Sequence, residues 1–376
     1  MAGRQLGVIA AGHELTAQAG ADILRAGGNA VDAAVAAMLA SFACEPLLTG
    51  PGAGGYMLVS APDTEPVLLD FFVEAPGHGA DPAARAELIP ITISFGDAVQ
   101  VFNIGAASVG TYGTPAGIHA AAERFGRVPL ADLAQPAVAM ARDGVLVTPQ
   151  QAYLFEILGD IVLSTPECAA VFAPDGQLPR TGDTVRQPEL ADALERLGRE
   201  GPEPFYTGDL GQAIVTWVGE RGGMLTAADL AGFRVIDREP IEVGYRERTV
   251  LTNPPPSAGG ILIARALAWL EAVPGPADAE RLVGVMERIQ AERTPAFLSG
   301  LDDPQFVRRF LGPLGSTTHI SVLDREGWAC AVTCSNGSCS GILVPGTGIH
   351  LNNMLGEHDL NPLGFHQHPP GGGCRA

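Results

Sequence analysis

Lysine is absent from this chain of 376 residues, so all 23 basic side chains are arginine. The absence excludes three classes of protein whose chemistry needs a lysine: P-loop nucleotide-binding proteins, protein kinases, and enzymes that form a lysine Schiff base. Acidic residues number 42, and the formal net charge is −19. Such a negative balance argues against a protein that binds nucleic acid or the surface of an anionic membrane.

Long hydrophobic runs and metal-binding patterns are also missing. No apolar stretch reaches the ~18 residues that a membrane-spanning helix needs, and the N-terminal apolar stretch is too short for a secretion signal. These features predict a soluble, cytoplasmic protein. No two cysteines form a Cys-x-x-Cys pair, so we expect free thiols and no metal site. The cysteines are Cys44, Cys168, Cys330, Cys334, Cys339 and Cys374.

The N-terminal region carries clear signals for the start and end of helices. A helix is predicted from Glu14 to Ala26, ended by Gly27 and Gly28. Asn29 is expected to cap a second helix, which is small and apolar on nearly every side and therefore buried between layers. The glycine run from Gly50 to Gly55 then leads into a strand. Without a following helix and a lysine, it indicates close backbone approach rather than a phosphate-binding loop.

Glycine and proline divide the rest of the chain into further elements. At 46% apolar residues, the chain can bury a large core, in two or three ordinary domains or in one layered domain. Residues 77–100 show no pattern that assigns them. We expect a strand at 67–72, helices at 113–124, 135–143, 190–197, 210–221 and 261–270, and strands around 234–252.

Residues 317–335 alternate between polar and apolar side chains on both sides of a short loop, which is typical of a β-hairpin. With Gly327 in the left-handed conformation, the turn pairs Asp324 with Trp328 and, counting back, Thr317 with Ser335. A shift of one residue would exchange the two faces of the hairpin. One face carries Thr318, Ile320, Val322, Cys330, Val332 and Cys334, and is fit for a core. The other carries a row of hydroxyls with one imidazole: Thr317, His319, Ser321, Thr333 and Ser335.

The hydroxyl row has two interpretations. A threonine hydroxyl becomes an effective nucleophile when a base lies beside it, and its own α-amino group is such a base once the preceding peptide bond is cleaved. This amine titrates near ~8, so part of it is a free base at neutral pH. Thr317 would then be the nucleophile, and Ser335 would orient its hydroxyl. Threonines are also common in strands without any chemistry, and the pattern alone leaves both interpretations open.

Seven segments, taken in order, resemble the γ-glutamyltransferase family of N-terminal-nucleophile hydrolases. They span nearly the whole chain: 27–34, 50–55, 113–117, 205–208, 254–260, 317–324 and 346–353. The resemblance implies an α+β fold, the four-layer αββα sandwich of these hydrolases. In that fold residues 29–43 would form a buried helix, and Thr317 would begin a central strand.

The resemblance also implies the reaction. The precursor would cleave itself between Ser316 and Thr317 into a large-subunit-like region, 1–316, and a small-subunit-like region, 317–376. Thr317 would then attack an amide carbonyl, form an acyl-enzyme, and pass the acyl group to water or an amino acceptor. The implied substrate is a small γ-glutamyl compound or a related amide, as in glutathione metabolism. No organic cofactor, metal, nucleic acid or membrane partner is expected.

Four further residues take roles from the resemblance. Ser335 matches the family residue that hydrogen-bonds the nucleophile. Asn336 matches a substrate-binding asparagine, and Asn353, in the paired-asparagine motif, is a second substrate-binding candidate. Glu357 falls where the family has an aspartate that binds the α-amino group of the substrate, and a carboxylate suits that partner.

The chain departs from the family pattern in three places. Phe72 or Val73 stands where the family has an arginine that binds the substrate α-carboxylate, and Met354 replaces a Gln or Glu. Only 60 residues, 317–376, remain from the nucleophile onward, without counterparts of the family's later serines, oxyanion glycines and several strands. We therefore expect a C-terminally truncated member that lacks strands of the sandwich, with a disordered tail and little or no transferase activity. The alternatives are an inactive fragment and a chain that needs a second chain to complete its site.

Overall fold

A central six-stranded sheet organises the computed structural model, which describes residues 7–96, 99–272, 275, 278–294, 297, 318–361 and 364–372. All neighbouring strands in this sheet are antiparallel. β11 and β12, from late in the chain, lie between β1 and β2, so both parts of the chain share one sheet. The order is β1 (Gly7–Ala10), β11 (Thr318–Asp324), β12 (Ala329–Ser335), β2 (Gly54–Ser60), β3 (Val67–Phe71) and β8 (Ile236–Arg238).

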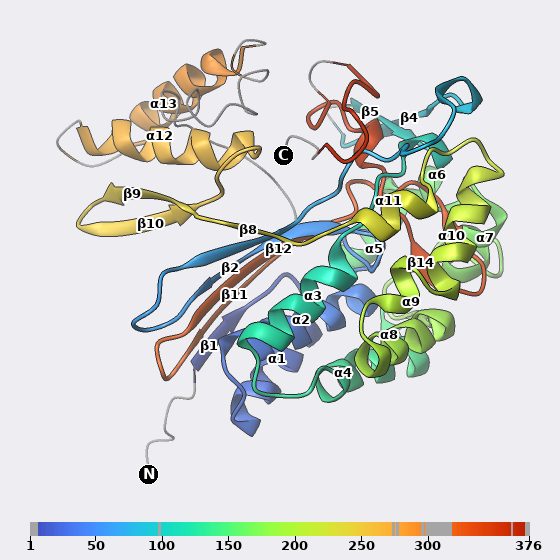
Figure 1. Cartoon of the computed structure of the whole chain (residues 1–376), viewed down its shortest axis with the longest axis horizontal. Helices are drawn as coiled ribbons and strands as arrows, with labels where there is room; N and C mark the ends of the chain where they lie inside the picture. The colour runs from blue at the N-terminus through green and yellow to red at the C-terminus, as the bar shows by residue number, and fades with distance from the viewer. Residues whose placement is uncertain are drawn as a thin grey trace.

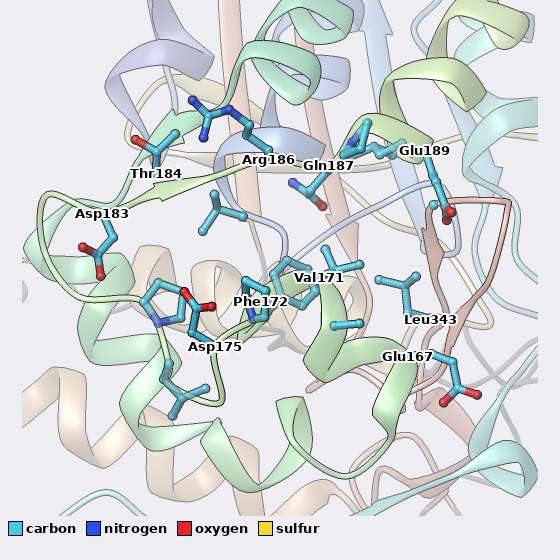
Figure 2. Close-up of a pocket in the computed structure, with 18 of the residues that line it drawn as sticks. Glu167, Val171, Phe172, Asp175, Asp183, Thr184, Arg186, Gln187, Glu189 and Leu343 are labelled. Atoms are coloured by element: carbon cyan, nitrogen blue, oxygen red, sulfur yellow. The ribbon is translucent and has the colours of Figure 1, made fainter.

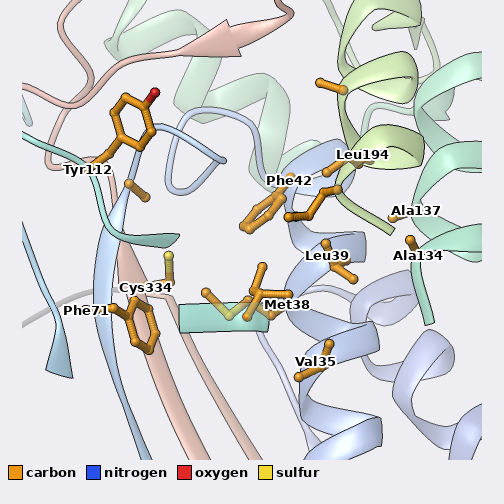
Figure 3. Packing of buried hydrophobic residues seen from close by; sticks show 14 of the residues in the cluster. Val35, Met38, Leu39, Phe42, Phe71, Tyr112, Ala134, Ala137, Leu194 and Cys334 are labelled. Carbon is orange, nitrogen blue, oxygen red and sulfur yellow. The ribbon is translucent and has the colours of Figure 1, made fainter. Parts of the chain in front are cut away.

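Helices cover one face of the sheet (Figure 1). At the centre of this layer lies α2, whose 15 residues are all buried. Figure 3 shows Met38 and Phe42 of α2 between Phe71 and Cys334 on the sheet side and Leu194 on the helix side. The small apolar helix is therefore buried between two layers, as predicted. The layer comprises α1 (Glu14–Ala26), α2 (Ala30–Cys44), α3 (Thr114–Phe125), α4 (Leu130–Asp143) and α8 (Pro188–Glu200).

Three side chains define the start of α2. The Asn29 side chain accepts hydrogen bonds from the backbone of Val31 and Asp32, both at 2.9 Å, and the Asp32 carboxylate accepts one from Asn29 N at 2.8 Å. This reciprocal pair is a capping box. Asp324, 294 residues away, accepts from Ala30 N at 3.0 Å. A carboxylate at a helix N-terminus is stabilised by the helix dipole, so Asp324 ties the hairpin to α2.

The predicted hairpin is confirmed in its register. Thr318 pairs with Cys334, and Asp324 N donates to Trp328 O at 2.9 Å. Gly327 has φ of 91°, the left-handed conformation that the turn requires. Along β11 buried and exposed residues alternate strictly, with the expected core face turned toward the helices.

A second set of elements lies on the side of the sheet away from α1–α4 (Figure 1). A two-stranded sheet packs against α12, and α12 packs against α13. Their small core contains Ile261, Leu262 and Ile289. The layers therefore follow the expected αββα order: the helices around α2, the six-stranded sheet, the smaller sheet, and the two helices α12 and α13. The described part of the second sheet has two strands. These elements are β9 (Ile241–Tyr245), β10 (Arg248–Thr252), α12 (Ala258–Ala272) and α13 (Ala279–Glu292).

The remaining elements gather at one end of the molecule (Figure 1). Many of them pack around a second hydrophobic cluster that includes Phe102, Phe155 and Phe172, whereas Phe205, Ile214 and Leu230 belong to the core around α2. In the described residues, no helix has the length and apolar character needed to cross a membrane. The helices are α5 (Pro149–Ile157), α6 (Gly159–Val162), α7 (Pro166–Phe172), α9 (Glu203–Tyr206), α10 (Asp209–Gly219) and α11 (Ala227–Gly232). The strands are β4 (Ile89–Ser94), β5 (Val99–Ile104), β6 (Val145–Leu146), β7 (Thr184–Val185), β13 (Leu343–Val344) and β14 (Ile349–His350).

Pro136 does not open its helix, contrary to the expectation from the sequence. The helix α4 begins at Leu130, with Asp132 in its first turn, and Pro136 lies inside it. Leu133 and Ala137, on either side of Pro136, are buried in the core around α2. This burial outweighs the local cost of an interior proline.

The tail is the second correction, because its described part is ordered against the body of the protein. Gly371 N donates to Ala75 O, and Ala75 N donates to Gly372 O, both at 2.8 Å. Gly77 lies next to Pro370. The short Pro- and Gly-rich segment is therefore held by backbone pairing with the chain after β3, which no local sequence signal indicates.

Candidate active site

Thr317 and Ser316, the expected nucleophile and its preceding residue, lie outside the described residues. The described strand begins one residue later, at Thr318, opposite Cys334. Ser335, the predicted partner of Thr317, follows Cys334 and ends β12. The pairing of Thr317 with Ser335 therefore stays a prediction, now supported by the observed register of its neighbours.

The hydroxyl row lies on the face of the sheet away from α2, as predicted. His319 connects it: its Nδ1 is 2.7 Å from the Thr333 hydroxyl, and its Nε2 is 3.0 Å from the Ser321 hydroxyl. Burial lowers the pKa of His319, so the neutral imidazole is favoured. A neutral ring with both nitrogens in hydrogen bonds holds these hydroxyls in fixed positions.

Ser335 ends β12, and Asn336 begins the loop that follows it. The Ser335 hydroxyl accepts a hydrogen bond from Gly337 N at 2.9 Å, and Gly337 has φ of 68°. Asn336 is fully buried, and its Nδ2 donates to the His350 carbonyl at 3.4 Å. Within the described part of the chain, its Oδ1 has no hydrogen-bond partner. An unpaired buried amide oxygen is costly.

Asn353 and Glu357 meet at Ser338. The backbone nitrogen of Ser338 donates to Asn353 Oδ1 at 2.9 Å and to Glu357 Oε1 at 3.0 Å. Its hydroxyl donates to Glu357 Oε1 at 2.9 Å and accepts from Asn353 Nδ2 at 2.7 Å. The pKa of Glu357 is raised by burial, and the hydrogen bonds from Ser338 offset only part of this rise. Asn353 N also donates to Asn336 O at 3.2 Å. The structure therefore brings all three substrate-binding candidates to one loop cluster.

Two residues of this region have roles that the sequence did not reveal. Ser338 is one, and the serine-rich run 335–340 is its only signal. The other is Asn352, whose Oδ1 accepts from Gly110 N at 3.0 Å and whose Nδ2 donates to Gly52 O at 2.9 Å. The paired asparagines were recognised as a motif, but Asn352 turns out to hold the glycine loop. A Cβ added to Gly52 would lie 2.4 Å from His350 O, which confirms close backbone approach there.

A large cavity lies apart from this loop cluster, between α7 and the segment that leads into α8. It measures about 1000 Å³ and is bounded by Phe172 of α7, by residues 174–190, and by Leu343. Figure 2 shows Asp183, Thr184 and Arg186 on the segment that leads into α8. None of the described candidate residues lines this cavity. In the described residues, no group of three or more His, Cys, Asp or Glu side chains is placed to hold a metal ion.

Comparisons with known proteins agree with this arrangement. A sequence model of the family described as Gamma-glutamyltranspeptidase matches residues 16–311 and 308–369. The chain is 32% identical over 396 residues to the glutathione hydrolase proenzyme of Escherichia coli (strain K12), covering 95% of this chain and 67% of that protein. It is also 32% identical to the acylase ACY 1 proenzyme of Pseudomonas sp. (strain V22), covering 95% and 70%.

Solved structures show the same likeness. Cephalosporin acylase from Bacillus halodurans superposes with a TM-score of 0.80 and 27% identity, covering 99% of this chain and 73% of that one. The γ-glutamyltranspeptidase of Helicobacter pylori superposes with a TM-score of 0.68 and 24% identity, covering 84% and 95%. The second likeness supports the fold alone.

Proposed function

Because the chain belongs to the gamma-glutamyltranspeptidase family, we propose that it is an autoprocessing threonine hydrolase or acyltransferase of γ-glutamyl or related amides. The observation that carries the proposal is the hairpin register. It pairs Thr318 with Cys334, next to Ser335 and the loop cluster of Asn336, Asn353 and Glu357, and so supports the predicted pairing of Thr317 with Ser335.

Self-cleavage precedes the reaction. The Thr317 hydroxyl attacks the carbonyl carbon of Ser316, the peptide C–N bond breaks, and an ester forms. Water hydrolyses this ester and leaves a free Thr317 α-amine on the new chain 317–376. The amine is then the base that the nucleophile needs.

Amide cleavage uses the same atoms. The Thr317 hydroxyl attacks the substrate carbonyl, its proton passes to the α-amine, and the amine returns a proton to the departing nitrogen. The acyl-enzyme ester is resolved by water or by an amino acceptor. Ser335 orients the hydroxyl, Asn336 Oδ1 accepts a substrate N–H, and the Glu357 carboxylate receives a substrate amino group.

The intact mass of the purified protein tests this proposal. Wild type is expected as two chains divided before Thr317, and Thr317→Ala as one uncut chain. Thr318→Val is the matched control, because Thr318 is buried and its hydroxyl has no partner among the described residues. It should be cleaved like wild type. An uncut wild-type chain, or a cleaved Thr317→Ala chain, would refute the assignment of Thr317.

A further inference from the structure

The large cavity between α7 and the segment that leads into α8 has an apolar floor. Phe172 and Leu343 of this floor are almost fully buried, and Val171 and Leu178 are half-buried. All four side chains line the cavity, and its volume of about 1000 Å³ accommodates a small organic molecule. None of the described candidate residues of the active site lines it, so a ligand here is independent of the proposed function.

One buried polar side chain on the cavity wall lacks a partner for its oxygen. Gln187 lines the cavity and is only 7% exposed. Its Nε2 donates to the Ala43 carbonyl at 3.4 Å, whereas its Oε1 has no hydrogen-bond partner among the described residues. A buried amide oxygen without a donor is costly. The wall therefore favours a ligand that offers an N–H group.

The arginine next to Gln187 does not serve this floor. In Figure 2, Thr184 and Arg186 point away from Phe172, whereas Gln187 points toward it. A Cβ added to Gly144 would lie 2.4 Å from Thr184 Cγ2 and 2.8 Å from Arg186 Cγ. Both side chains therefore extend along Gly144, at the end of α4, and the Arg186 guanidinium is not offered to a ligand on the floor.

Carboxylates stand on two opposite sides of the floor. Figure 2 shows Asp175 and Asp183 on one side of Phe172, and Glu167 and Glu189 on the other. All four acids line the cavity. A ligand that extends across the floor therefore meets negative charge at both of its ends, and apolar side chains in between.

These carboxylates retain free acceptor positions. Asp183 Oδ2 accepts one hydrogen bond, from Arg180 N at 2.7 Å, and Glu189 Oε2 accepts one from a backbone N–H at 3.0 Å. Glu167 makes a single ion pair, with N and O 3.8 Å apart, and Asp175 has no partner among the described residues. An ionised carboxylate has about four acceptor positions. Against these acids, Arg180 is the one remaining cation among the described lining residues.

We propose that this cavity binds linear polyamines. The end ammonium groups pair with the carboxylates on the two sides of Phe172, because charge-assisted hydrogen bonds to carboxylates are strong. An inner amine donates to Gln187 Oε1. The methylene groups between the amines lie on the apolar floor and are removed from water. A carboxylate at either end of the ligand would meet like charge.

Three ligands of equal length test the two ends and the middle. Bis(3-aminopropyl)amine has two end ammonium groups and an inner amine, 1,7-diaminoheptane has a methylene in place of the inner amine, and 7-aminoheptanoate has a carboxylate in place of one ammonium. In calorimetric titrations of the wild-type protein, the first is expected to bind most tightly. The third should bind at least about tenfold more weakly, because its carboxylate is repelled. Equal affinity for the first and third ligands, or no binding of the first, would overturn the proposal.

Two substitutions in the lining and one control locate the site. Asp175→Asn should weaken binding of bis(3-aminopropyl)amine about threefold, the effect of one exposed ion pair. Val171→Arg places a cation on the floor and should weaken it at least about tenfold. Glu242→Gln removes one charge from an exposed position of β9 outside the cavity, and should leave the Kd unchanged. Equal weakening by Asp175→Asn and Glu242→Gln would mean that only the net charge of −19 attracts the amine, and would refute the site.

Gln187→Leu tests the contact with the inner amine. The variant should lose the advantage of bis(3-aminopropyl)amine over 1,7-diaminoheptane, and an unchanged advantage would exclude Gln187 from binding. Intact masses separate this site from the proposed function, because Asp175→Asn and Val171→Arg should give the same masses as wild type. Polyamine binding and self-cleavage can therefore fail independently of each other.

Discussion

Glu74 is one residue through which pH is expected to act on stability. Burial, then the charges of Asp70 and Asp229, raise its pKa to about 7, although His78 and Arg238 oppose the shift. Between the ordinary carboxyl pKa of about 4.5 and 7, the folded protein keeps a proton that the unfolded chain releases. The stability that Glu74 contributes is therefore complete below this window and is lost as the pH rises through it.

Glu74→Gln should remove this dependence. The quantity of interest is the unfolding free energy of the variant minus that of wild type. After allowance for solvent screening, this difference is expected to be on the order of 1 kcal/mol larger at pH 8 than at pH 5. Urea denaturation of both proteins at the two pH values measures the difference. An equal difference at pH 5 and pH 8 would show that Glu74 titrates normally.

At the scale of elements, the turn between β11 and β12 sets the register that the candidate site needs. Gly327 has φ of 91°, and a Cβ added there would lie 3.3 Å from Pro62 Cγ. Gly327→Ala should lower the free energy of unfolding by about 1–2 kcal/mol, because L-residues are strained in this conformation. Urea denaturation provides the value.

Gly284→Ala is the control of opposite sign. Gly284 lies inside α13, and a Cβ added to it meets no atom within 4 Å. An alanine there should raise stability by about 1 kcal/mol because of its higher helix propensity. If both substitutions moved stability in the same direction, backbone strain at Gly327 would not be the cause.

At the scale of the whole molecule, the two helical layers should differ in local stability. Every residue of α2 is buried, whereas in α13 only Ile289 is, and Leu282, Val283 and Met286 are exposed. Local opening is easier where few apolar contacts are lost. Backbone amides of α13 are therefore expected to exchange with deuterium at least about 100-fold faster than those of α2. Equal protection, measured by mass spectrometry or NMR, would contradict this ordering.

Much of the fold near the site could be predicted because its signals are local. Gly27, Asn29 and Asp32 mark the boundary between α1 and α2 within six residues, and capping acts over one helical turn. The hairpin register follows from Gly327 and strict alternation. Pro136 shows the limit of local signals, because burial against α2 decides where α4 begins.

The candidate site could be predicted only in part. Family motifs indicated Asn336, Asn353 and Glu357, and the structure brings them together. Ser338 could not be identified, because its role depends on a turn that directs its hydroxyl toward both Asn353 and Glu357. Asn352 could not be separated from Asn353 by sequence, since only the packing shows which amide meets the glycine loop.

By itself, the sequence determined the helix caps, the turn, the two faces of the hairpin and the family, because each is written in adjacent residues or in ordered motifs. Only the tertiary structure decided which distant residues contact these local features. Asp324 caps a helix that begins 294 residues earlier, and Phe72 stacks on Tyr56 and packs against the cluster that contains Met354. Such contacts depend on how sheet and loops pack, and packing brings together residues whose spacing in the chain carries no signal.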